Sequence, residues 1–108
     1  MLDIVQVDLT RCGGFTEADK IASLAADRGL KVANHGFSTY INVHAALHWL
    51  NAVPNALIAE FGVQENTDLR EYLTTNNVRS VDGSLPIPDA PGLGIELNEE
   101  QVRKFRVA

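Results

Sequence analysis

The chain has 108 residues, 45% of them hydrophobic, and a net charge of −5. This length allows one domain or a piece of a larger one, and the composition is that of a globular protein. The acidic balance and the scattered basic residues argue against a nucleic-acid-binding surface. The sequence contains no membrane-length apolar run, no signal-peptide pattern and a single cysteine, so we expect a cytoplasmic protein without nucleic-acid or membrane partners.

The first predicted unit is strand, turn, helix, strand. Residues 2–8 are a near-continuous apolar strand, which is typical of a parallel sheet buried on both faces. Because such a strand rarely opens a domain, we expect that preceding sequence is missing. Residues 11–14 (RCGG) predict a tight turn, and Gly29 predicts the end of the helix before a second strand over residues 30–33.

Capping signals set the expected start of that first helix. Thr16 is a good N-cap residue, and Asp19 three positions later resembles a capping box. Small apolar residues then recur at helical spacing, which allows the helix to lie close to a sheet.

A second unit follows the same pattern. Residues 40–53 predict a helix that is apolar on more than one face, and Pro54 ends it before a third strand over residues 56–61. Two β-α-β units in tandem predict an α/β fold with a parallel sheet and right-handed crossovers.

The character of the chain changes after Gly62, so we divide it into residues 1–62 and a C-terminal tail over residues 63–108. Residues 64–73 predict a short helix, and the following segment rich in proline and glycine predicts loops and short irregular strands. Asn98 with Gln101 predicts the cap of a final helix over residues 99–105.

Each predicted strand ends at a residue that can handle protons or bind a charged group: Asp8, His35 and Glu60. Carboxyl ends of parallel strands meet at one edge of a sheet, where β/α enzymes keep their active sites. A carboxylate beside a histidine fixes its tautomer and makes it a competent general base. The alternative is that these residues are not catalytic: the aspartate is structural, the histidine faces solvent, and the glutamate is paired with a basic residue.

Three other motifs have weaker functional interpretations. His44 and His48 have the spacing of zinc ligands on a helix, but the glutamate of the metalloprotease motif is absent, which favours packing histidines. Cys12 has no basic partner fixed in sequence, so we interpret it as an inert small residue. Gly13 and Gly14 fall short of a phosphate-binding loop.

The chain resembles the C-terminal part of the mandelate racemase/muconate lactonizing enzyme family in the enolase superfamily. The matching segments are VDLTRCGGFTEADKIASLA, VANHGF, the tryptophan-containing helix with PNALIAEF, and PDAPGLGIEL. The resemblance covers essentially the whole chain. It implies barrel strands six to eight of a (β/α)7β TIM-like barrel, with a tail that packs back toward the barrel and a capping domain.

The resemblance also implies roles for the three strand-end residues. Asp8 and His35 match the Asp–His dyad of the mandelate racemase subgroup, with His35 as base or acid, and Glu60 matches a glutamate that hydrogen-bonds the substrate carboxylate. The position of Asp8 holds lysine in the muconate lactonizing and dipeptide epimerase subgroups, which points away from them. The implied reaction is Mg²⁺-dependent proton abstraction next to a carboxylate, followed by dehydration of a sugar acid.

The family's Mg²⁺ ligands and its Lys-x-Lys base lie on strands two to five, which this chain does not contain. We therefore expect the magnesium of a full-length, homo-oligomeric parent to have ligands outside this chain. The 108-residue chain alone is expected to be inactive and to self-associate through its open sheet. The alternatives are a racemase or epimerase of 2-hydroxy acids and an inert barrel remnant.

Overall fold

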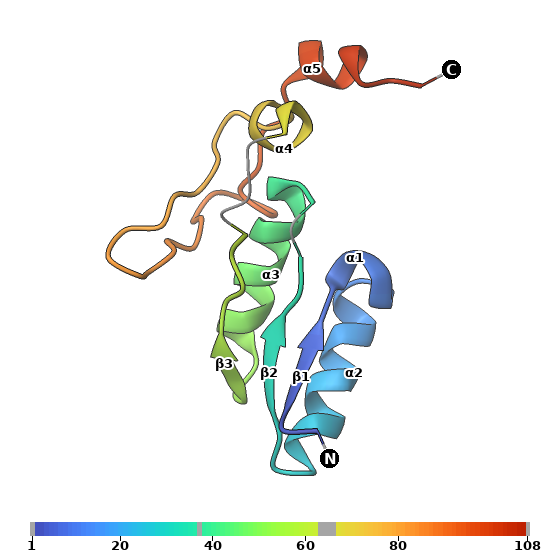
Figure 1. Ribbon diagram of the computed structural model, residues 1–108, viewed down its shortest axis with the longest axis vertical. Helices are drawn as coiled ribbons and strands as arrows, with labels where there is room; N and C mark the ends of the chain where they lie inside the picture. The colour runs from blue at the N-terminus through green and yellow to red at the C-terminus, as the bar shows by residue number, and fades with distance from the viewer. Residues whose placement is uncertain (1, 37, 63–66, 108) are drawn as a thin grey trace.

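The computed structural model describes residues 2–36, 38–62 and 67–107. Its three strands form one parallel sheet in the order β1-β2-β3 (Figure 1). The predicted α/β class and the two tandem β-α-β units are therefore confirmed. The elements along the chain are β1 (Ile4–Val7), α1 (Leu9–Cys12), α2 (Phe15–Ala26), β2 (Lys31–Asn34), α3 (Tyr40–Ala52), β3 (Ala56–Ile58), α4 (Asp68–Tyr72) and α5 (Glu99–Lys104).

Helices α2 and α3 pack together on one face of the sheet. Helix α2 buries three alanines at helical spacing, and these small side chains allow the helix to approach the strands closely. Helix α3 contributes Trp49, which is only 1% exposed. The core that joins both helices to the sheet consists of Val7, Leu9, Ala18, Ala22, Ala25, Val32, Ala45, Ala46 and Trp49.

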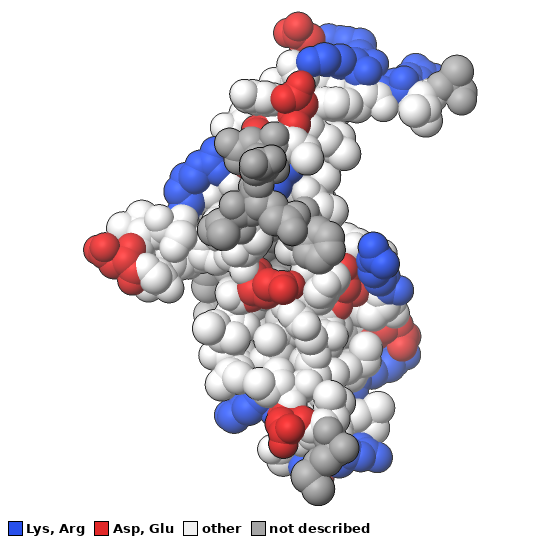
Figure 2. All heavy atoms as spheres, in the orientation of Figure 1, with Lys and Arg blue, Asp and Glu red and all other residues white. Residues whose placement is uncertain are grey.

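Some apolar side chains of the sheet lie outside this core and are exposed. Ile4 on β1 is 43% exposed, and Leu57 and Ile58 on β3 are 52% and 66% exposed. Figure 2 shows mostly uncharged residues over the sheet, with acidic side chains near the carboxyl ends of the strands. Isolated exposed apolar residues are ordinary, but a group on one sheet marks a surface that can be covered by further protein.

The connection between β1 and α2 differs from the prediction. Asp8 ends the strand by capping a short helix, because its carboxylate accepts the backbone N–H of Thr10. Gly13 ends α1 in a left-handed conformation with φ of 110°, where glycine is favoured. Helix α2 then begins at Phe15 with Gly14 as its N-cap, so the predicted cap at Thr16 is wrong.

The ends of α2 and α3 agree with the predictions. The N–H groups of Gly29 and Leu30 donate to the carbonyls of Ala26 and Ala25, and Gly29 has φ of 68°. This is the arrangement of a helix-ending glycine. Helix α3 ends at Ala52, one residue before the predicted end at Val53 and two before Pro54.

The second and third strands are placed differently from the prediction. Strand β2 is Lys31–Asn34 rather than residues 30–33, and β3 ends at Ile58 rather than at residue 61. The pairing of β2 with β3 shifts register between Val32 and Ala33, a β-bulge that leaves regular pairing short. No sequence pattern marked this irregularity.

Helices α4 and α5 of the tail lie beyond the carboxyl ends of the strands, and the loop between them returns to the side of α3 and β3 (Figure 1). The side chain of Asn98 accepts the N–H of Gln101, which confirms the predicted cap of α5. Helix α4 falls within the predicted helix over residues 64–73, although residues 64–66 lie outside the described residues. Between these helices the described chain forms two isolated bridges, Thr74 with Leu97 and Val81 with Ser84, and no longer strand. None of the described helices is long and apolar enough to cross a membrane.

Candidate functional site

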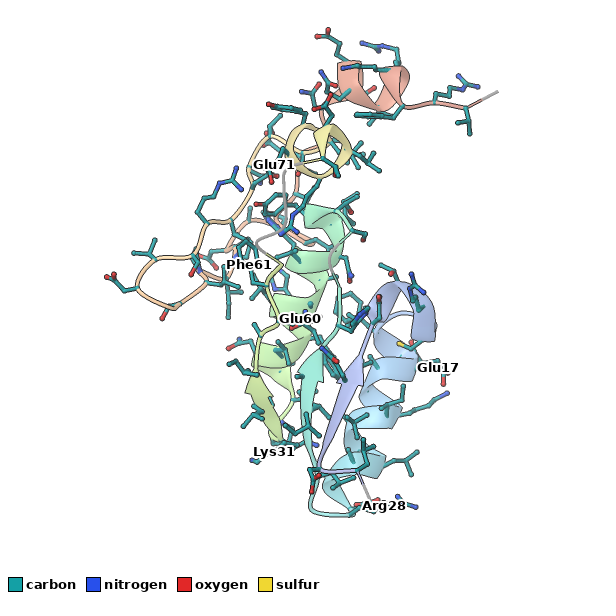
Figure 3. All side chains as sticks on the ribbon, viewed as in Figure 1. Glu17, Arg28, Lys31, Glu60, Phe61 and Glu71 are labelled. Carbon is teal, nitrogen blue, oxygen red and sulfur yellow. The ribbon has the colours of Figure 1, made fainter. Side chains whose placement is uncertain are left out.

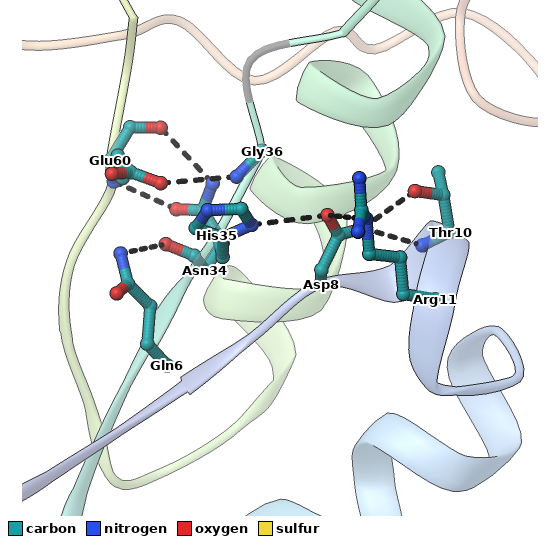
Figure 4. Close-up of polar contacts among 8 residues, drawn as sticks. All are labelled: Gln6, Asp8, Thr10, Arg11, Asn34, His35, Gly36 and Glu60. Carbon is teal, nitrogen blue, oxygen red and sulfur yellow. Dashed lines mark hydrogen bonds and ion pairs between the residues drawn. The ribbon is translucent and has the colours of Figure 1, made fainter.

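The three predicted site residues lie at one edge of the sheet, as their spacing required (Figure 4). Asp8 follows β1 directly, His35 follows β2 directly, and Glu60 lies two residues beyond β3. Parallel strands bring their carboxyl ends together, so side chains that are far apart in sequence become neighbours.

Asp8 is held on both carboxylate oxygens. Oδ1 accepts hydrogen bonds from the backbone N–H of Thr10 at 2.9 Å and from its hydroxyl at 2.6 Å. Oδ2 lies 3.1 Å from Nδ1 of His35 and 3.6 Å from Nε of Arg11. Partial burial raises the pKa of Asp8, but the hydrogen bonds from Thr10 and His35 outweigh it and leave the pKa below its ordinary value. Asp8 is therefore a fixed negative charge beside His35.

His35 is oriented by this carboxylate. Its side chain is 35% exposed, whereas that of Asp8 is 12% exposed. Because an ionised carboxylate only accepts hydrogen bonds, Nδ1 of His35 is the donor of the pair, and Nε2 is the nitrogen without a proton in the neutral ring. The dyad has the arrangement of an oriented general base.

Glu60 reaches the same edge, where its carboxylate is bonded to the backbone of the segment that follows His35. Its Oε2 accepts the N–H of Gly36 at 3.0 Å, and Gly36 is the residue that follows His35. Glu60 and His35 are thus linked through one peptide segment. Figure 3 shows Glu60 between the sheet and the tail, next to Phe61.

Asn34 is the residue that the sequence analysis missed. It is 2% exposed, and its carboxamide bonds both backbone polar groups of Glu60: Nδ2 donates to the Glu60 carbonyl at 3.0 Å, and Oδ1 accepts the Glu60 N–H at 2.8 Å. One signal was available in the sequence. An amide at the end of an otherwise apolar strand must find hydrogen-bond partners when it is buried.

The other singled-out residues are bonded to other parts of the chain. Nδ1 of His44 and Nε2 of His48 lie 3.1 Å and 3.3 Å from the carbonyl oxygen of Leu93 in the tail. These contacts agree with packing histidines. Cys12 is half-buried, and its Sγ lies 3.7 Å from the carbonyl oxygen of Gly14.

The described residues of this chain do not form a metal site of their own. Among the described residues, no three side chains of histidine, cysteine, aspartate or glutamate gather where they could hold an ion together. Both oxygens of Asp8 are already bonded to protein groups. We therefore derive no chemical step through a metal held by these residues.

Comparisons with known proteins agree with this geometry. The family model described as enolase C-terminal domain-like matches residues 1–101. The chain is 37% identical to the D-galactarolactone cycloisomerase of Agrobacterium fabrum, over 98% of this chain and 30% of that protein. It is 33% identical to the D-galactonate dehydratase of Xanthomonas campestris pv. campestris, over 95% of this chain and 28% of that protein.

A solved structure from Burkholderia xenovorans, bound to magnesium and fumarate, superposes with a TM-score of 0.85 and 30% identity. The match covers 95% of this chain and 25% of that one. The chain thus spans less than a third of the length of these relatives, and its three strands correspond to part of the enolase-type barrel. It belongs to the mandelate racemase/muconate lactonizing enzyme family of the enolase superfamily.

Proposed function

We propose that this chain forms the proton-transfer edge of a lyase that dehydrates a sugar acid. The observation that carries the proposal is the Asp8–His35 pair, at 3.1 Å, on the strand edge shared with Glu60. Similarity to a D-galactonate dehydratase over nearly the whole chain supports sugar acids as the substrate class.

His35 and Asp8 would perform the proton transfers. The C–H bond next to the substrate carboxylate breaks, and its electron pair forms a double bond as the hydroxyl on the neighbouring carbon leaves. In our proposal His35 moves the proton and assists departure of the hydroxyl as water. Asp8 keeps the ring oriented and stabilises its charged form by staying ionised, for which a lowered pKa is suited.

Glu60 would position the substrate. Its carboxyl group is anchored by the Gly36 N–H, next to the dyad in sequence and in space. A side chain that is already held in one rotamer can orient a bound substrate without further loss of side-chain entropy. This favours alignment of the substrate C–H bond with His35.

We assign magnesium, if the complete enzyme uses it, to ligands outside this chain. A structural relative was solved with magnesium, whereas the described residues of this chain bring together no three ligating side chains. A divalent ion would supply charge stabilisation for a carboxylate-bearing intermediate.

An isomerase is the second candidate. The relative with 37% identity is a cycloisomerase, which favours a reaction that conserves mass. A racemase or epimerase also belongs to this class. Product analysis separates the two candidates, because dehydration lowers the mass of the sugar acid by one water and isomerisation leaves it unchanged.

A chimera tests the proposal directly. The segment of the Xanthomonas dehydratase that matches this chain would be replaced by residues 1–108, and the product assayed with magnesium against a panel of sugar acids. We expect loss of water from at least one of them. The substitution His35→Asn should lower kcat by about 10²- to 10⁴-fold, the usual contribution of a general base.

His48→Asn is the matched control, since this histidine bonds the tail carbonyl of Leu93 rather than the dyad. It should leave kcat within about threefold. A folded chimera without turnover on any sugar acid, or one whose activity survives His35→Asn, would contradict the proposal.

The isolated chain should show no turnover and should self-associate. Ile4, Leu57 and Ile58 expose apolar surface on the sheet, and such groups are covered when proteins associate. Light scattering after gel filtration measures the assembly state, and a monomer at high concentration that unfolds cooperatively would contradict this expectation.

A further inference from the structure

We propose that Asn34 is a positioning residue. Its buried carboxamide replaces one pair of backbone hydrogen bonds of the sheet and so holds the Glu60 carboxylate against the Gly36 N–H. The proposal deepens the function given above, since it rests on the role assigned there to Glu60. It concerns how the site is built, and its test requires no turnover.

Regular pairing between β2 and β3 stops short of Glu60. The last paired residues are Ala33 and Ile58, directly after the bulge. The peptide of Glu60 would therefore have unpaired polar groups at a half-buried position, which is unfavourable for a backbone N–H and C=O.

The side chain of Asn34 supplies the missing partners. A carboxamide carries a donor and an acceptor side by side, as a peptide group does, and here Nδ2 and Oδ1 bond the carbonyl and N–H of Glu60 at 3.0 Å and 2.8 Å. The side chain thus extends the sheet by one pairing where the backbone cannot.

This pairing has a consequence for the site. With its backbone fixed to Asn34, Glu60 turns its carboxyl group to the N–H of Gly36, two residues after Asn34. Gln6 adds a further link, because its Nε2 donates to the backbone carbonyl of Asn34 at 3.4 Å. Asn34 is therefore bonded to the segment after β3 through its side chain and to β1 through its backbone carbonyl, at the edge that holds the dyad (Figure 4).

The chain contains a matched comparison. Asn55 is also a buried asparagine, 8% exposed, and its Nδ2 donates to two backbone carbonyls, of Ala22 and Leu30. These contacts lie at the opposite end of the sheet, before β3 begins. Asn55 should therefore contribute to stability without influence on Glu60.

The experiment follows the Gly36 amide by NMR in the full 108-residue chain labelled with ¹⁵N-glycine. In the wild type this resonance should shift as the Glu60 carboxyl titrates, because Oε2 accepts its N–H. The substitution Glu60→Gln identifies the resonance by removing the titration. We expect Asn34→Ser to reduce the titration shift at least about threefold, since hydrogen bonds weaken steeply with geometry.

Asn34→Leu is the second variant, because it keeps a similar side-chain volume but loses both the donor and the acceptor to the Glu60 backbone, and it adds no titrating group. It should also reduce the shift, whereas Asn55→Ser should preserve it despite a lower melting temperature. An unchanged shift in the Asn34 variants, an equal reduction in Asn55→Ser, or loss of folding in both Asn34 variants would overturn the proposal. Because the readout is independent of turnover, an inactive chimera would contradict the dehydratase proposal and leave this result unaffected.

Discussion

Residues 2–62 and residues 67–107 are held together in different ways. In the first region, helices α2 and α3 and strands β1 and β2 share a continuous apolar core around Trp49 and the alanines of α2. Among the described residues of the tail, Val78 is the only buried hydrophobic side chain. The tail is attached to α3 by polar contacts and by a smaller apolar cluster, in which Val78 packs with Tyr40, Val43 and Leu47. These contacts include the carbonyl of Leu93 bound to His44 and His48.

Arg70 is an example of a directional contact that holds the tail. It is 4% exposed, and its guanidinium lies 5.2 Å from the ring centre of Tyr40 and 5.4 Å from that of Phe61. Cation–π contacts add to the apolar packing of Tyr40 where α4 meets the start of α3. The comparison teaches that the region with the candidate site is built around the larger apolar core, whereas the tail combines a small apolar cluster with a few directional contacts.

The largest effect should come from the core of the first region. Trp49→Ala should lower the free energy of unfolding by about 3–5 kcal/mol, because it leaves a large cavity between both helices and the sheet. Circular dichroism during chemical denaturation measures this loss. Tyr72→Ala, an aromatic residue of the tail that is 56% exposed, should change it by no more than about 0.5 kcal/mol. Equal losses would show that the tail shares the core.

The attachment of the tail should be weaker and local. The side chain of His44 is 1% exposed. The substitution His44→Leu fills the same space with an apolar side chain and removes one hydrogen bond to the carbonyl of Leu93. We expect a loss of about 1–2 kcal/mol. Hydrogen exchange at the Gly94 amide should accelerate, while exchange in β2 stays unchanged.

His48→Leu is the control for this contact, since His48 is only half-buried and its distance to Leu93 is longer. Its effect on Gly94 exchange should be smaller. If neither substitution changed exchange at Gly94, the two histidines would not attach the tail.

The charge of Asp8 should appear in the pH dependence of stability. The pKa of Asp8 is lowered in the folded state. The ionised form therefore stabilises the fold at pH values above the pKa of the unfolded chain, which is about 3.9. This contribution is lost as pH falls through the folded pKa. Asp8→Asn should lower the melting temperature at pH 7, by the equivalent of about 1 kcal/mol, and reduce the acid dependence. Asp19→Asn, an exposed residue of α2, should leave the pH profile as it is.

The smallest effect on global stability should come from the end of the tail. Asn98→Ala removes the cap of α5, a helix in which no residue is buried. We expect the free energy of local unfolding of this helix to fall by about 1 kcal/mol, with an unchanged melting temperature for the first region. Amide protection within Glu99–Lys104 measures it. A global shift in melting would show that α5 is coupled to the sheet.

The sequence by itself determined the order of elements in the first region and the position of the dyad. Apolar periodicity and helix-ending glycine are local signals, and they placed three strands, two helices and the turn at Gly29 within a few residues. The parallel arrangement followed, because two neighbouring strands joined by a crossover helix run in the same direction. Once the strands are parallel, Asp8 and His35 must end at the same edge, and the structure brings them to 3.1 Å.

Only the tertiary structure decided the remaining details. The early end of β3 depends on a register shift against β2, and Asn34 is bonded to a residue 26 positions away. The shared partner of His44 and His48 lies more than 40 residues along the chain. The partners of a buried polar group are set by which backbone groups the fold leaves unpaired nearby, and no local pattern encodes that. Long-range hydrogen bonds of this kind therefore become visible only after the chain is folded.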